Sequence, residues 1–217
     1  MTRHFTWDYV ERATLRDGTH VVLRLTTPED KEILRRGFDK WSPESRYARF
    51  LVPKSRLTDD ELRYLVDVDQ ETHFALGAIR EEGDGHGEPI GLGIARFIRL
   101  PGVEPPTAEA AVAVADEVQG QGLGRLLLLR LAAAAAERGI HRVRCELHGT
   151  NTSMKALIDE LAPDHTVAVR SGVISMDFVI PPIAADAAEA PTSPLYRFFR
   201  AAAEGTIGRV RNFWKKD

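Results

Sequence analysis

A carboxylate, a glutamine and three glycines stand close together in the stretch "AEAAVAVADEVQGQGLGR". Glu109 opens a run of small and apolar residues, and Gly120, Gly122 and Gly124 come just before a leucine- and alanine-rich run. A carboxylate can accept a proton as a general base. A strand, a glycine-rich turn and a helix N-terminus together offer unpaired N–H groups and a positive helix dipole to an anion. The stretch therefore predicts an anion-binding loop with an acid on the strand before it.

Three known glycine loops compete for this stretch. The phosphate loop G-x-x-x-x-G-K-[ST] needs a lysine and a hydroxyl, and neither follows here. The dinucleotide fingerprint G-x-G-x-x-G is not met, because "GQGLGR" reads G-x-G-x-G. The pattern Q/R-x-x-G-x-G/A is met by Gln119, Gly122 and Gly124. A glycine-rich turn that holds no ligand remains the structural alternative.

With this third pattern the chain resembles the GNAT N-acetyltransferase superfamily over nearly all of residues 19–182. The segments "SPESRYARF", "LTDDELRYLVDVDQETHFAL", "AEAAVAVADEVQGQGLG" and "NTSM" are most similar to the catalytic domain of bacterial protein-lysine acetyltransferases. The resemblance implies an α/β GNAT fold: a mixed twisted sheet of about seven strands, flanked by helices, with a splayed strand pair that holds acetyl-CoA. It implies transfer of an acetyl group from this cosubstrate to an amine, with a protein lysine as the favoured acceptor.

The resemblance also implies roles for individual residues. Glu109 becomes the general base, although an acid facing solvent at a strand end is the alternative. The Val114 N–H becomes the donor to the thioester oxygen, and the backbone from Gln119 to Arg125 holds the pyrophosphate. The implied acetyl-CoA-binding set is Val112, Ala113, Val114, Gln119, Gly120, Gln121, Gly122, Leu123, Gly124, Arg125 and Asn151.

Asn151 and Ile158 fall on the helix after the splayed strand. Asn151 is an ordinary N-cap residue, and in the superfamily this position often contacts CoA as well. Many members carry a tyrosine about seven residues later as general acid. Ile158 occupies that place here, so no general acid is assigned. His141 and His148 lack the cysteine or carboxylate spacing of a metal site, and none is expected.

The periodicity of the chain supports this organisation. A strand, three helices, a hairpin, a strand, a helix, a strand, a helix and a closing hairpin are expected in that order. Residues 1–18 are expected to be a short lead-in and 19–182 the acetyltransferase domain. The alanine- and proline-rich residues 183–194 are a linker, and 195–217 a basic amphipathic segment.

Composition narrows the class of protein. The formal net charge of −3 argues against a nucleic-acid binder. The single cysteine, Cys145, excludes an internal disulfide framework and fits the cytoplasm. No signal sequence is visible, and no run approaches the roughly 20 apolar residues of a membrane span.

Several alternatives stay open from the sequence. The acceptor can be a small-molecule amine, or the chain can be an acyl-CoA-binding regulatory module with little catalysis. An unrelated α/β protein with a coincidental loop is the third possibility. The segment 195–217 has six basic and two acidic residues. It suits docking on its own domain or dimerisation better than an anionic membrane surface, because Gly205 and Gly208 interrupt its helical pattern.

Overall fold

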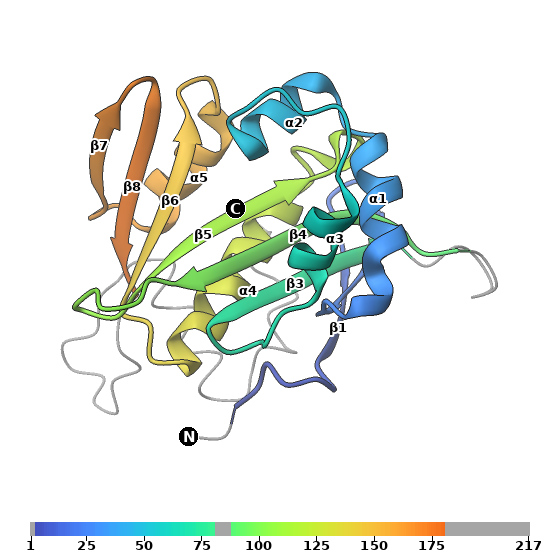
Figure 1. The fold of residues 1–217 in the computed structure, drawn as a ribbon, viewed down its shortest axis with the longest axis horizontal. Coiled ribbons are helices and arrows are strands. Elements are labelled where there is room, and N and C mark those ends of the chain that lie inside the picture. Colours follow the sequence, from blue (N-terminus) through green and yellow to red (C-terminus); the bar gives the residue numbers. More distant parts are fainter. Residues whose placement is uncertain (1–2, 81–87, 181–217) are drawn as a thin grey trace.

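Residues 3–80 and 88–180 are described by the computed structural model, in which helices cover both faces of one mixed sheet (Figure 1). The eight strands lie in the order β1-β2-β3-β4-β5-β6-β8-β7. Every neighbouring pair is antiparallel except β5 and β6, which run parallel. The predicted α/β class is confirmed, with eight strands rather than about seven.

The strands are β1 (Val10–Thr14), β2 (His20–Leu25), β3 (His73–Arg80), β4 (Ile90–Arg99), β5 (Thr107–Val114), β6 (Arg142–His148), β7 (Thr166–Arg170) and β8 (Val173–Val179). The helices are α1 (Lys31–Asp39), α2 (Pro43–Phe50), α3 (Asp59–Val66), α4 (Leu123–Glu137) and α5 (Thr152–Leu161), with short 3-10 turns η1 (Pro28–Asp30) and η2 (Asp116–Val118).

The additional strand is β1, which lies inside the expected lead-in. It pairs with β2 from Val10 opposite Arg24 to Thr14 opposite His20. Its side chains are exposed or half-buried, so no apolar alternation marks it in the sequence. The sheet therefore begins before residue 19.

Local capping explains where the helices on the front of the sheet begin. The Ser42 hydroxyl accepts a hydrogen bond from the Ser45 amide at 3.2 Å, and Pro43 occupies the first turn of α2. Thr58 and Glu61 form a reciprocal capping box at the start of α3. An N-cap of this kind stabilises a helix by about 1 kcal/mol. Both caps depend only on residues within a few positions of the helix start.

The core lies mainly between α4 and the back of the sheet, whereas α1 and α3 cover the front (Figure 1). The Leu123, Leu127 and Leu131 side chains of α4 are fully buried against the central strands. A second apolar cluster lies under α1 and α3 and contains Phe38 and Leu62. The short helix α2 lies at the end of the sheet toward which β5 and β6 run, and it contacts both strands (Figure 1).

No helix among residues 3–80 and 88–180 is long and apolar enough to cross a lipid bilayer. The expected linker at 183–194 and basic segment at 195–217 lie outside the described residues.

Candidate active site

Strands β5 and β6 separate halfway along their length. They pair in parallel from Thr107 opposite Arg142 to Ala110 opposite Cys145. Beyond that point β5 continues to Val114 and β6 to His148 without further pairing. A V-shaped gap therefore opens between the two central strands, with its apex at Ala110 and Cys145.

The backbone of β5 offers alternate N–H groups to this gap. The Ala115 amide donates to Leu92 of β4 at 2.8 Å, and on the antiparallel ladder with β4 Ala113 lies two positions before it. Because hydrogen-bonded pairs alternate along such a ladder, the Ala113 amide also points to β4. The amides of Val112 and Val114 point the other way, into the gap. The expectation that all of 112–114 offers backbone there is therefore corrected: Ala113 contributes only its surface.

The loop after β5 is shaped by glycines in the left-handed region. Gly120 has a φ of 74° and Gly122, the residue before α4, a φ of 96°. These values strain any residue with a Cβ. The first amides of α4 have no acceptor in a preceding turn, as at every helix N-terminus. The turn therefore directs N–H groups of 122–124 outward at the mouth of the gap.

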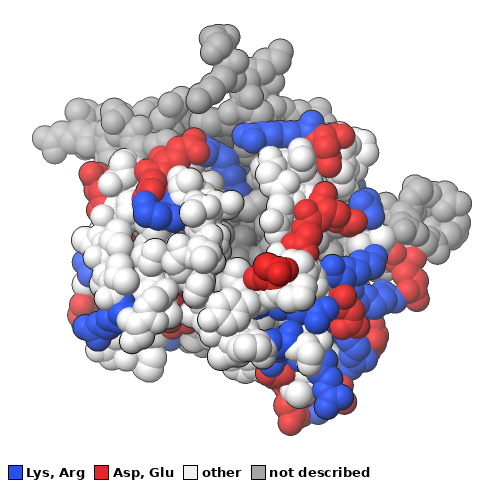
Figure 2. Space-filling view, turned by 90° about the horizontal axis from the view of Figure 1, so that it is seen from above, with Lys and Arg blue, Asp and Glu red and all other residues white. Residues whose placement is uncertain are grey.

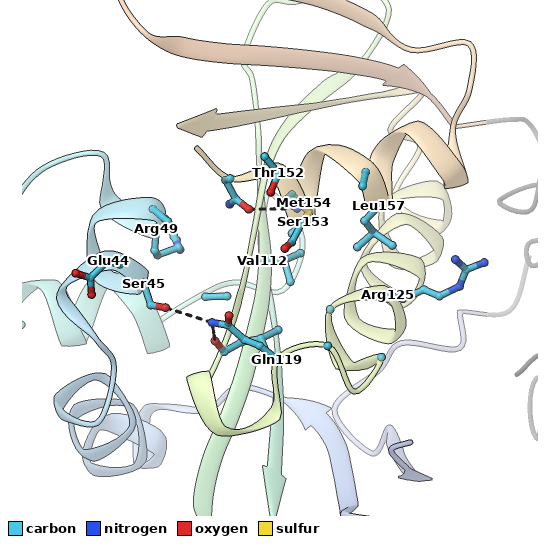
Figure 3. A pocket seen from close by; sticks show the side chains of 18 of the residues that line it. Glu44, Ser45, Arg49, Val112, Gln119, Arg125, Thr152, Ser153, Met154 and Leu157 are labelled. Carbon is cyan, nitrogen blue, oxygen red and sulfur yellow. Dashed lines mark hydrogen bonds between the residues drawn. The ribbon is translucent and has the colours of Figure 1, made fainter. Parts of the chain in front are cut away.

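Gln119 braces this loop through its side chain (Figure 3). Its Nε2 donates to the Val114 carbonyl at 3.2 Å, to Asp116 Oδ1 at 2.9 Å and to Ser45 Oγ at 3.2 Å. The Asp116 carboxylate also accepts from the Ser45 hydroxyl and, at 2.6 Å, from the Ser42 amide. These contacts join the N-terminus of α2 to the glycine loop, and no local sequence pattern indicates them.

The remaining loop residues differ in which of their groups, backbone or side chain, are available to a ligand. Gln121 is held through its backbone, whose carbonyl accepts from the Arg16 amide at 3.1 Å. Leu123 is fully buried, so it can offer only its amide. Gly124 faces Val114: a Cβ added there would lie 3.6 Å from Val114 Cγ2, which is ordinary contact. The Arg125 guanidinium pairs with Glu160 of α5 at 2.7 Å and ties α4 to α5.

Helix α5 closes the other side of the gap. Asn151 is its N-cap, and its Oδ1 accepts from the Met154 amide at 3.2 Å. Ile158 is completely buried, so the place where a tyrosine acid was sought holds a core side chain.

A cavity of about 580 Å³ runs through this region between α2, β5, the glycine loop and α5 (Figure 3). Nine of the eleven residues expected to bind the cofactor line it, and Gln121 and the buried Leu123 do not. Figure 2 shows the end of the molecule seen from above, where charged side chains of both signs gather on the α1 and α3 half and few on the β7 and β8 half. The predicted residues among the lining are Val112, Ala113, Val114, Gln119, Gly120, Gly122, Gly124, Arg125 and Asn151.

Glu109 lies one residue before the apex of the gap. Its side chain is exposed and does not line the cavity. Alternation along β5 puts it on the same face as Ala111 and Ala113, the face covered by α2. Its charge interacts with the guanidinium groups of Arg49 on α2 and Arg144 on β6. The packing of α2 on β5 brings Arg49 to the same site.

A buried polar cluster lies farther along the same face. Arg96 of β4 is 4% exposed, donates a hydrogen bond to Nε2 of His73 and stacks 4.9 Å over the Tyr64 ring. Burial and the Arg96 charge lower the pKa of His73 to about 4. His73 is therefore neutral at pH 7, with the proton on Nδ1.

This lowered pKa predicts an acid-sensitive fold. Between pH 6.5 and about 4 the unfolded chain binds a proton at His73 that the folded chain excludes. Stability contributed here is present above pH 6.5 and lost as the pH falls through that window. In His73→Gln, whose amide oxygen can still accept from Arg96, we expect about 1 kcal/mol less acid destabilisation, a value discounted for solvent screening.

The measurement is the free energy of unfolding by urea at pH 7 and pH 5. The exposed His141→Gln serves as control for the loss of a histidine. Equal acid sensitivity in wild type and His73→Gln would contradict the prediction.

Comparison with known proteins places these features in a family context. The sequence profile of the Acetyltransferase (GNAT) family matches residues 34–161. Acetyltransferase PA5475 of Pseudomonas aeruginosa is 31% identical over 144 residues, which cover 66% of this chain and 75% of that protein. Acetyltransferase Pat of Mycolicibacterium smegmatis is 32% identical over 171 residues, 78% of this chain, but the match spans only 48% of that protein. The crystal structure of the GNAT domain of S. lividans PAT superposes with a TM-score of 0.68 at 29% identity, covering 78% of this chain and 96% of that domain.

Proposed function

The chain belongs to the acetyltransferase (GNAT) family, and from that premise we propose that it acetylates a protein lysine with Glu109 as general base. Its membership makes it an acyltransferase, and the acyl donor of the family is acetyl-CoA. The observation that carries the finer proposal is the unpaired gap between β5 and β6, which opens onto the glycine loop at one end and approaches Glu109 at the other. The segments that resemble protein-lysine acetyltransferases favour the lysine acceptor.

The residues present suit a pyrophosphate and an extended thiol arm. The amides of 122–124 and the helix dipole of α4 favour an anion at the loop. Space stands open beside Gly120, where an added Cβ would meet nothing within 4 Å. The Val112 and Val114 amides can pair with the amides of the arm as an added strand would. Asn151 borders the same path from α5.

The reacting end of acetyl-CoA belongs near the apex of the gap. Val112 is three residues from Glu109 and Val114 five, so along the strand they lie about 10 Å and about 16 Å from it. We therefore assign the N–H that polarises the thioester oxygen to Val112, in place of the Val114 expected from the sequence. Val114 then holds the arm nearer the loop.

In the proposed reaction the chain handles one proton and one developing charge. Glu109 takes a proton from the acceptor ammonium, directly or through a water, and leaves a free amine. The amine nitrogen bonds to the acetyl carbonyl carbon, whose oxygen is stabilised by the Val112 amide. The carbon–sulfur bond then breaks and the nitrogen loses its second proton. The thiolate is protonated by that proton or by solvent, since buried Ile158 cannot supply one. Acetyl-CoA contributes the activated acetyl group.

The test measures CoA release with acetyl-CoA and lysine-containing proteins, alongside polyamines, aminoglycosides and amino acids. Turnover on proteins supports a protein lysine as the acceptor. Turnover confined to small amines would show that the acceptor is a small molecule instead. Tight acetyl-CoA binding without turnover on any amine would leave only a binding module. We place this activity in the cytoplasm, in keeping with the reduced, fully buried thiol of Cys145.

Gly124 allows the loop assignment to be tested on its own. An added Cβ has room beside Val114 in the free protein, and a carboxylate is favourable in the first turn of a helix, so Gly124→Glu should fold with a melting temperature near that of wild type. The added carboxylate at the helix N-terminus repels a pyrophosphate and keeps it from the amides. We expect acetyl-CoA to bind about ten to a hundred times more weakly, a loss of about 1.4–2.8 kcal/mol.

Isothermal titration with acetyl-CoA measures this loss. Gly124→Ala is the matched control and should keep most of the affinity, because the Q/R-x-x-G-x-G/A pattern allows alanine at this position. Unchanged affinity in Gly124→Glu would remove this residue from the cofactor site.

A further inference from the structure

Two arginines lie beside Glu109 on the α2 side of the sheet, and their charges are not neutralised by ion pairs. Within the described ranges 3–80 and 88–180, no carboxylate lies within 4.0 Å of the guanidinium nitrogens of Arg49 or Arg96. Arg96 has only aromatic and imidazole neighbours, the Tyr64 ring and the uncharged His73. Arg49 lies with its guanidinium 5.1 Å over the Phe50 ring.

Of these two arginines, Arg49 lines the cavity and Arg96 does not. Arg49 projects from α2 toward β5 and lines the cavity opposite Val112 (Figure 3). It interacts electrostatically with both Arg96 and Glu109. Burial, together with the nearby positive charge of Arg49, lowers the pKa of Arg96 to about 10.

Two neighbouring arginines differ from this pair in having strong hydrogen-bond acceptors, a carboxylate for Arg144 and two backbone carbonyls for Arg46. Arg144 forms a bidentate pair with the Asp177 carboxylate, with both distances at 2.9 Å. Arg46 of α2 donates to the carbonyls of Ser55 and Asp39 at 2.8 and 3.0 Å. Burying two guanidinium groups near each other costs free energy that an anion would offset. A planar guanidinium is the group best suited to bind a carboxylate.

We infer that Arg49, supported by Arg96, binds a carboxylate carried by the acceptor, so that the preferred acceptors have an acidic group next to the reacting amine. The inference rests on the proposed acetyl transfer at the same site and names its substrate class. The amine that gives its proton to Glu109 stands beside Arg49, within reach of an anion on the same molecule. That carboxylate has two sources: the α-carboxylate of a free amino acid, or an aspartate or glutamate next to a lysine in a protein.

The experiment compares acceptors that differ only in this charge. One arm uses lysine peptides with aspartate or asparagine beside the lysine, and the other uses free amino acids and their carboxamides. We expect kcat/KM from CoA release to be about tenfold or more higher for the acidic member of a pair. Preference in the peptide arm identifies a protein source, and preference in the amino-acid arm a small-molecule source.

Variants of Arg49 then show whether this arginine is responsible for the preference for acidic acceptors. Arg49→Gln should reduce the ratio between acidic and neutral acceptors to near one, and Arg49→Lys should keep part of it. Arg63→Gln, an exposed arginine of α3, should retain the wild-type ratio. The variant's melting temperature and its stabilisation by acetyl-CoA verify the fold.

The outcomes separate the two proposals. Acetylation of acidic and neutral acceptors at equal rates overturns this inference and leaves the proposed acetyl transfer standing. No turnover on any acceptor overturns both. A wild-type ratio preserved in Arg49→Gln also overturns it.

Discussion

Glu109→Gln is expected to lower kcat/KM for acetyl transfer by about 10²–10⁴-fold, the usual contribution of a general base. Glutamine keeps the shape of the side chain but cannot accept the proton that leaves the acceptor ammonium. Because Glu109 is exposed and makes no hydrogen bond within the described residues, the substitution should leave the melting temperature near that of wild type. Acetyl-CoA should bind as before, since Glu109 does not line the cavity.

Steady-state CoA release, with acetyl-CoA titration alongside, separates these effects. Glu104→Gln, in the exposed loop before β5, is the matched control and should retain wild-type kinetics. Undiminished turnover in Glu109→Gln would remove this carboxylate from the mechanism. Loss of turnover together with loss of acetyl-CoA binding would point instead to a structural defect.

The largest stability effect is expected at Glu11, a residue of β1 far from the site. Its carboxylate forms a bidentate pair with Arg130 of α4, with Nε and Nη2 both 2.6 Å from its oxygens, and accepts from the Tyr9 hydroxyl. Only 6% of the Arg130 side chain is exposed. Burial opposes ionisation of Glu11, but Arg130 and Tyr9 outweigh it and lower its pKa.

Glu11→Gln removes the charge that neutralises this buried guanidinium. We expect a loss of about 3–5 kcal/mol of unfolding free energy, the cost of breaking a buried pair. For a chain of this size that loss lowers the melting temperature by about 6–20 °C. Calorimetry measures both quantities.

Two further variants establish that the effect comes from the buried charge. Glu32→Gln breaks the exposed pair with Arg35 and should cost at most about 1 kcal/mol. The double variant Glu11→Leu/Arg130→Met, which replaces the pair with apolar side chains, should recover most of the lost stability. A cost for Glu11→Gln no larger than that for Glu32→Gln would contradict the prediction.

The sequence predicts local features of this molecule well. Asn151 caps α5 as expected, because an N-cap depends on neighbours only a few positions away. The strand β1 is not predicted, because its side chains are exposed or half-buried and show no apolar alternation. It is held in the sheet by its hydrogen-bonded pairing with β2, which cannot be read from local sequence. The 3-10 turn η2 between β5 and the glycine loop is missed for a similar reason, since three residues carry no period.

In the candidate site, too, the features that depend on neighbouring residues are predictable from the sequence, and those that depend on packing are not. The glycine loop and Glu109 lie on one continuous stretch, so their spacing can be read directly. The proximity of Arg49 to Glu109 and of Ser45 to Gln119 depends on how α2 packs across β5, which no local pattern encodes. The alternation that turns the Val112 amide into the gap and the Ala113 amide away from it requires the register with β4.

The hydrogen bonds of Gln119 have a consequence for how two substrates would bind. Through Ser45 and Asp116 they connect the glycine loop to α2, the helix that carries Arg49, so the proposed donor and acceptor sites are linked by the same hydrogen bonds. A ligand that changes the conformation of the loop is therefore expected to shift the helix, and such a coupling acts equally in both directions. For the proposed function, we expect the affinity for acetyl-CoA and the affinity for the acceptor to depend on each other.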